Sequence, residues 1–198
     1  MKRLQWLGST LFVGMLVMAS APGCSDGTSE TTTSSGSSSG QTPWVPVKIV
    51  INEMHAVTED WVEISNEDTI EADLSGVGLT DKATDGTPEL TNAFRFPAGT
   101  KLAPGAYVIV VANLKPPASG PQTTCLMSGG PSVCYQASWG ISSANGDRIY
   151  LLSPTDEVVD VATYPMAATP DTQSYCRLPD GTGNFQPCTP TPGAENAP

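Results

Sequence analysis

The chain has 198 residues, of which 9 are basic and 20 acidic, giving a formal net charge of −11. An acidic surface repels phosphate backbones and anionic headgroups, which argues against nucleic-acid binding and against electrostatic adhesion to a membrane. Eighteen prolines and nineteen glycines leave no long window for an amphipathic helix, and the length suits one domain plus tails.

Residues 1–23 have the pattern of a signal peptide. Lys2 and Arg3 give a positive start, residues 4–19 are mostly apolar, and small residues follow. This apolar stretch is nearer in length to a signal peptide than to a spanning helix. No stretch after residue 45 approaches ~18 consecutive apolar residues, the length that would indicate another spanning segment.

Two cleavage positions compete at the end of this segment. Cleavage after Ala21 fits a small-residue site but leaves Pro22 as the first residue, where its fixed φ and missing N–H suit an extended substrate poorly. Cleavage after Gly23 leaves Cys24 at the N-terminus. The sequence Ala21-Pro22-Gly23-Cys24 resembles the lipobox of bacterial lipoproteins, which normally carries Leu first. We expect lipidation of Cys24; simple secretion, with Cys24 as an unpaired thiol, is the alternative.

Residues 24–46 are expected to be a lipidated cysteine and a flexible tether. Residues 25–43 are nearly all Ser, Thr and Gly, which bury too little apolar area to offset their ordering entropy. Stable anchoring requires several acyl chains, since one chain binds only marginally. Ser25 after Cys24 resembles an outer-membrane sorting signal, so we expect a lipid-anchored envelope protein, periplasmic or surface-exposed. Loss of Lys2 and Arg3 would bring the net charge to −13.

Residues 47–198 read as short β-type runs separated by Gly, Pro, Asn and Asp. Seven or eight such runs are typical of a β-sandwich. The run 107–111 is apolar throughout, which predicts a central strand covered on both faces. We expect an all-β domain with strands at 47–54, 60–65, 74–80, 93–96, 106–112, 148–153, 158–164 and 174–178.

Two strands show clear alternation. Ile49 and Ile51 alternate with Lys48 and Asn52, which predicts that Asn52 lies on the polar face. In the next strand Trp61 is expected to fill the core.

Two segments break the strand pattern. Residues 113–138 contain several Gly and Pro residues and predict an irregular insertion, either a functional loop or a tolerated surface loop. The segment from Thr189 is Pro-rich and is expected to pack along a sheet edge.

The chain has five cysteines. Lipidation of Cys24 would leave four, which can pair in three ways. We expect Cys125–Cys134 and Cys176–Cys188, because each pair closes a short local loop. Zinc is the rival interpretation, but spacings of nine and twelve residues do not resemble a zinc knuckle, and an oxidising compartment favours disulfides.

An ordered series of motifs spans about residues 47–196. The motifs are Ile51-Asn52-Glu53, Asp60-Trp61-Val62-Glu63-Ile64-Ser65-Asn66, Asp73-Leu74-Ser75-Gly76, Leu79-Thr80-Asp81, Phe96-Pro97, Pro104-Gly105-Ala106-Tyr107-Val108, Gly146-Asp147-Arg148-Ile149-Tyr150-Leu151, Val159-Asp160, Ser174-Tyr175, Asp180-Gly181 and Thr191-Pro192-Gly193. In their order and spacing these motifs resemble the lamin tail domain. The resemblance implies an immunoglobulin-like β-sandwich with no catalytic residues to transfer. The family includes the tails of nuclear lamins and bacterial exported proteins that combine the module with hydrolase or nuclease domains. The insertion and the cysteines lie outside the pattern, and the chain lacks a coiled-coil rod.

The polar residues of these motifs are expected to be structural. Asn66, Asp73 and Asp81 stand where turns need side chains that bond the backbone. Asp147 and Asp160, at strand boundaries, are expected to bond amides or nearby arginines rather than to act as acids.

One acid–base or metal cluster can be drawn from Glu53, His55 and Asp60, since a strand places Glu53 and His55 on the same face. His55 is the chain's single histidine, and an exposed residue at a strand end is the preferred interpretation. Outside the Ser/Thr/Gly stretch 25–43 the sequence contains no Gly-x-Ser-x-Gly elbow, and it contains no phosphate loop. We therefore expect no enzyme.

Calcium is a weaker cofactor hypothesis. The turns at 81–85 and 180–184 are rich in oxygen ligands, with Asp81, Asp85 and Asp180 as candidates. Calcium requires six to eight oxygens, and neither turn has an EF-hand register. Plain turn chemistry is the preferred interpretation, so no cofactor is expected.

The predicted function is that of a non-enzymatic envelope module that binds a protein or a glycan, or serves as a scaffold. The alternative is an accessory subunit of a separately encoded extracellular hydrolase or nuclease. The expected contact with the membrane is through lipid, and no nucleic-acid partner is expected.

Overall fold

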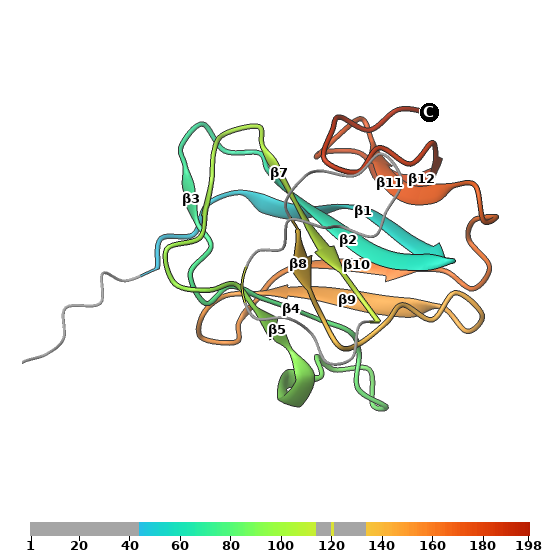
Figure 1. The fold of residues 1–198 in the computed structure, drawn as a ribbon, viewed down its shortest axis with the longest axis horizontal. Helices are drawn as coiled ribbons and strands as arrows, with labels where there is room; N and C mark the ends of the chain where they lie inside the picture. The colour runs from blue at the N-terminus through green and yellow to red at the C-terminus, as the bar shows by residue number, and fades with distance from the viewer. Residues whose placement is uncertain (1–43, 114–119, 121–133) are drawn as a thin grey trace, which may run out of the picture. The chain divides into compact units, whose positions relative to one another are not determined.

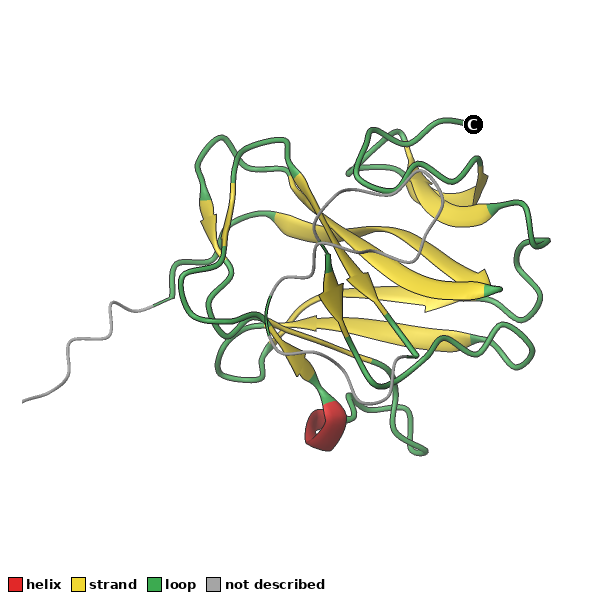
Figure 2. Cartoon of the chain, viewed as in Figure 1, coloured by secondary structure: helices red, strands yellow, loops and turns green. Residues whose placement is uncertain are grey.

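The computed structural model describes residues 44–113, 120 and 134–198, which form short strands and one turn of 3-10 helix (Figures 1 and 2). The predicted all-β class is confirmed. In chain order the elements are β1 (Ile49–Val57), β2 (Glu59–Asn66), β3 (Ala72–Asp73), β4 (Gly78–Thr80), η1 (Leu90–Asn92), β5 (Phe94–Arg95), β6 (Lys101–Leu102), β7 (Tyr107–Val111), β8 (Tyr135–Gln136), β9 (Asp147–Leu152), β10 (Val158–Tyr164), β11 (Ser174–Leu178) and β12 (Asn184–Cys188).

Two sheets pack face to face. The larger has the strand order β12-β11-β1-β2-β7-β8 and the smaller has the order β10-β9-β4-β5. A two-stranded ribbon pairs β3 with β6. The strand pairs are antiparallel except β7 with β8. Figure 1 shows β1 and β2 running above β9 and β10. This arrangement is an immunoglobulin-like β-sandwich.

The core lies between the two sheets. Val62 and Ile64 of β2 are fully buried there, together with Ile149 and Leu151 of β9. Trp61 does not fill this core as expected. Because successive strand residues face opposite sides, Trp61 points to the outer face of the large sheet. It is buried there in a second cluster with Ile109, Val111 and Cys134. The prediction that 107–111 is covered on both faces is confirmed.

Several strand boundaries differ from the prediction. Of the expected strand 74–80, only residues 78–80 form a strand, which is β4. The preceding residues form a turn, because the Leu74 carbonyl accepts a hydrogen bond from the Val77 amide and Gly76 has a φ of +75°. β8 lies inside the expected insertion, pairing with β7. β12 was not predicted, since Pro187 interrupts its pattern; proline is tolerated there because β12 is an edge strand.

Two β-bulges interrupt the ladders. In β1 the register shifts between Ile51 and Glu53, so Asn52 is the extra residue. In β10 the shift falls between Val158 and Asp160. A bulge redirects side chains locally. The bulge in β1 positions Asn52 of the candidate site, and the bulge in β10 positions Val158 and Val161 of the apolar strip described below.

Asp160, beside the bulge in β10, joins the two sheets because it bonds to Ile51 beside the bulge in β1. Its carboxylate accepts hydrogen bonds from the Ile51 amide and the Val161 amide, both at 2.8 Å, and pairs with Arg177 at 3.1 Å. Asp147 likewise accepts bonds from the amides of Ser142 and Arg148. The structural role predicted for both acids is therefore confirmed.

The turn residues behave as expected at two of three positions. Asn66 donates to the carbonyls of Ile70 and Leu102, and Asp73 accepts from the Ser75 amide. Asp81 differs, because its buried Oδ1 has no hydrogen-bond partner. Among the residues described, no helix is long and apolar enough to cross a membrane.

Candidate functional site: a buried carboxylate network

Asn52 is the centre of a polar network on the outer face of the large sheet. The bulge in β1 leaves its side chain fully buried, contrary to the expected polar face. Its Nδ2 donates to Glu63 Oε1 at 2.8 Å and to Asp180 Oδ1 at 3.0 Å. Its Oδ1 accepts from the Gly181 amide at 2.9 Å and from Asn196 Nδ2 at 3.0 Å. One side chain thus links β1, β2, the β11–β12 turn and the segment 189–198.

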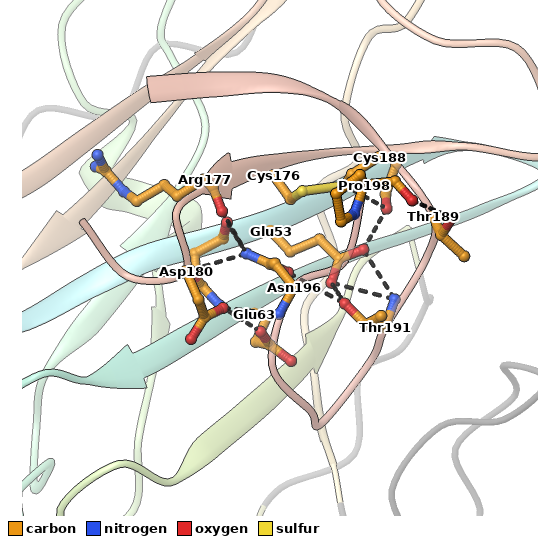
Figure 3. The surroundings of a disulfide bond; sticks show 12 residues. Glu53, Glu63, Cys176, Arg177, Asp180, Cys188, Thr189, Thr191, Asn196 and Pro198 are labelled. Carbon is orange, nitrogen blue, oxygen red and sulfur yellow. Dashed lines mark hydrogen bonds between the residues drawn. A yellow bond between two sulfur atoms is a disulfide. The ribbon is translucent and has the colours of Figure 1, made fainter. Parts of the chain in front are cut away.

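Glu53 and Glu63 are the acids of this network. They lie directly opposite each other on β1 and β2, and both are fully buried. Glu53 accepts bonds from the Ser174 hydroxyl and from the amide and hydroxyl of Thr191. Glu63 Oε2 accepts from the Gly193 amide at 2.6 Å. Figure 3 shows the Glu53 and Glu63 side chains next to Thr191 and Asn196.

Burial changes the acidity of these groups. Desolvation raises the pKa of Glu53 despite its hydrogen bonds to Ser174 and Thr191. Desolvation likewise raises the pKa of Glu63 to about 8, with a smaller contribution from the charges of Glu53 and Asp180. Tyr107 donates to Asp180 Oδ2 at 2.7 Å. Burial raises the pKa of the Tyr107 phenol, and this hydrogen bond raises it further.

The segment 189–198 was expected to pack along an edge, but it lies over the two central strands. Thr191 contacts Glu53 of β1 and Gly193 contacts Glu63 of β2. The segment turns back on itself, since Thr189 and Ala197 form an isolated bridge. Buried carboxylates require hydrogen-bond donors, and the segment 189–198 supplies donors to Glu53 and Glu63 on the outer face. This need for donors explains why the segment packs there.

The predicted acid–base cluster is only partly assembled. Glu53 and His55 do share the outer face of β1. His55, however, is buried, with 6% of its surface exposed, and not exposed as expected. Its Nδ1 lies 2.7 Å from the Glu59 carbonyl oxygen, and its ring stacks on Trp61. Asp60 Oδ2 accepts from the Ile141 amide at 2.9 Å. None of the three lines either of the two cavities found beside Lys82 and Phe94.

The calcium candidates lie in separate environments. Asp180 faces the network, where both of its oxygens accept hydrogen bonds. Asp85 accepts from the Thr87 hydroxyl and amide, which lower its pKa. Burial raises the pKa of Asp81. Within the described residues, no group of three or more His, Cys, Asp or Glu side chains could hold a metal ion. The described geometry therefore gives the calcium hypothesis no support.

A disulfide fixes one side of the network. Cys176 of β11 and Cys188 of β12 are bonded, as predicted, and are almost fully buried (Figure 3). Ser174, the donor to Glu53, lies 3.4 Å from the Cys188 sulfur. Cys134 is also disulfide-bonded. Its predicted partner Cys125, like Cys24, lies outside the described residues, and those two assignments stay predictions.

Sequence reasoning missed most of this network. Glu63 and Thr191 stand in motifs that carry the family resemblance, yet nothing local marks these two residues or Asn196 as partners. The one signal present was the polar pair Asn52-Glu53 within an otherwise apolar run from Ile49 to Met54. Two adjacent polar residues there break strand alternation, which is the pattern of a bulge.

Fold and site together define an immunoglobulin-like module whose buried acids serve its own architecture. The family model for the Lamin Tail Domain matches residues 44–165, and the chain belongs to this family. The match ends before β11, so the disulfide and the segment 189–198 lie beyond the matched residues. A comparison with curated proteins gave no match.

Proposed function

We propose that the chain is a non-enzymatic module of the bacterial cell envelope, anchored through lipid on Cys24, that binds a partner near the membrane. Its family and the structural use of its buried acids support a binding or scaffolding role. The Ser/Thr/Gly tether supports presentation at a distance: 19 residues of this composition reach roughly 22–26 Å by the square-root rule for flexible linkers.

The observation that carries a binding role is an apolar strip on the small sheet. Val158 and Val161 are 51% and 44% exposed. The bulge in β10 sets Val158 opposite Leu152 and Val161 opposite Tyr150, so both valines lie on the outer face. Met166, 69% exposed, follows in the next turn. Exposed apolar side chains on an acidic domain favour a protein partner over a glycan.

The anchor is tested by intact-mass analysis of full-length protein extracted from membranes, with and without reductant. We expect a product that begins at Cys24 and carries acyl chains, and a mass that rises on reduction as disulfides open. A Cys24→Ser variant should move to the soluble fraction. A water-soluble wild-type product that begins at Pro22 contradicts the proposed anchor.

The binding surface is tested by cross-linking in intact cells. Two lysines in place of Val158 and Val161 should reduce the cross-linked product about tenfold or more, because each buried valine contributes about 1.5 kcal/mol to binding. Leu90→Lys is the matched control, since Leu90 is 49% exposed on η1. Equal products from all three proteins would contradict the strip as an interface. Retention on envelope polysaccharide that survives both lysines would indicate a glycan instead.

A further inference from the structure

The segment 189–198 is attached to the sandwich by hydrogen bonds to three acids and by the bonds that Asn196 Nδ2 donates to Asn52 and to the Arg177 carbonyl. The Thr191 amide lies 3.1 Å from Glu53 Oε1, and its hydroxyl lies 3.0 Å from Glu53 Oε2. The amides of Gly193 and Asn196 donate to Glu63 and Asp180. The segment contains no large apolar side chain, and Asn196 is its one buried residue. Its docking therefore depends on the state of the carboxylates beneath it.

No lysine or arginine pairs with these acids within the described part of the chain. The nearest guanidinium, on Arg177, is directed to Asp160 and to the carbonyls of Ile51 and Gly183. The ion pairs of the described residues involve neither Glu53 nor Glu63. Like charges directly opposite each other on paired strands destabilise the pair.

The remaining titratable groups around the pair are acidic, phenolic or committed elsewhere. His55 on β1 has an electrostatic contact with Glu53, but its Nδ1 is occupied by the Glu59 carbonyl. Asp180 approaches from the β11–β12 turn, and Tyr107 of β7 bonds to it. Glu67 lies beside the turn, near Gly181, and Glu195 on the segment itself is exposed.

We propose that the segment 189–198 is a pH-dependent cover, docked while the Glu53–Glu63 pair retains a proton and released when both carboxylates are ionised. β1 and β2 are central strands held on both sides, so they have little freedom to separate. The cover is held on one side alone, with its root fixed at Cys188 by the disulfide. Water can reach two ionised acids most easily if the cover moves away.

The direction of the pH effect follows from the raised pKa values. A carboxyl group whose pKa is higher in the folded protein binds more protons there than in the unfolded chain. Its contribution to docking is fully present below the ordinary pKa of 4.5 and is lost as the pH rises through about 8 for Glu63. The donors on the cover favour the ionised acids, but burial outweighs them in both groups.

The test is amide hydrogen exchange on the full chain, with rates corrected for the intrinsic effect of pH. Between about pH 6 and about pH 9, the protection of the Thr191 and Gly193 amides should fall about tenfold or more, and it should level off above about 8, where Glu63 is ionised in the docked state as well. The Val62 and Ile64 amides of β2 should keep their protection. Unchanged protection at Thr191 and Gly193 would overturn the proposal.

Two variants separate this cover from general alkaline loosening. Glu63→Gln removes the titrating group, so protection of the cover should become nearly independent of pH in this range; a persisting fall would count against the pair as the switch. Glu195→Gln changes an exposed acid of the same segment and should behave as the wild type. If Glu63→Gln lowers protection in β2 and so disturbs the fold, Glu53→Gln takes its place with the same expected result.

Discussion

Replacement of Asn52 by alanine is expected to lower the free energy of unfolding by about 4 kcal/mol. The substitution removes two donated and two accepted hydrogen bonds from a fully buried position. Each buried polar group left without a partner costs about 1–3 kcal/mol, and Glu63, Asp180, Gly181 and Asn196 each lose one bond. Urea unfolding of the purified domain, followed by tryptophan fluorescence, measures the change.

Asn184→Ala is the matched control for this experiment. Asn184 is exposed on β12, the edge strand, and its replacement should change the stability by less than about 0.5 kcal/mol. Equal losses in the two variants would mean that Asn52 does not organise the network. A loss in Asn52→Ala accompanied by a smaller m-value would indicate a broken two-state transition instead.

Gly183→Ala is expected to lower the free energy of unfolding by about 3 kcal/mol or more. A Cβ at this position would lie 2.0 Å from the Leu178 carbonyl group, which is backbone and has no alternative rotamer. The β11–β12 turn would have to shift, and with it Asp180 and its bonds to Asn52 and Tyr107. Thermal and urea unfolding would both report the loss.

Gly86→Ala provides the comparison for that clash. Gly86 has a φ of +85°, but a Cβ there would meet no atom within 4 Å. Its replacement should therefore cost only the backbone strain of about 1–2 kcal/mol. If both alanines cost the same, the close approach of residues 178 and 183 is not what requires a glycine.

The sequence pattern predicted the longer strands of the fold. The runs in β2, β7, β9 and β10 were found within one or two residues, because short β-type runs bounded by turn residues indicate strands, even where both faces are covered, as in β7. β12 was missed since an edge strand buries little and carries Pro187. β8 was missed because two residues are too few to show a period.

The candidate site was less accessible to sequence reasoning than the fold. His55 and Glu63 are polar side chains, and the default expectation for such residues is exposure. Glu63 is buried by a distant segment, which contributes the Gly193 amide, whereas His55 is buried against Trp61, its neighbour on the same hairpin. The positions of Glu53 and Asn52 depend on a bulge, which local propensity does not encode strongly. Long-range pairing of this kind carries no signature within a single stretch of sequence.

Asp160 affects how neighbouring copies of the chain can associate through their sheet edges. β10 ends its sheet, and terminal strands present backbone groups to which a neighbouring chain can add. Here the Asp160 carboxylate accepts a hydrogen bond from the Val161 amide and pairs with Arg177 at this edge strand. Copies held on one membrane by the proposed anchor would meet at high local concentration. Asp160 protects this one edge of each copy from strand addition, while Val158 and Val161 stay exposed on the outer face of the small sheet.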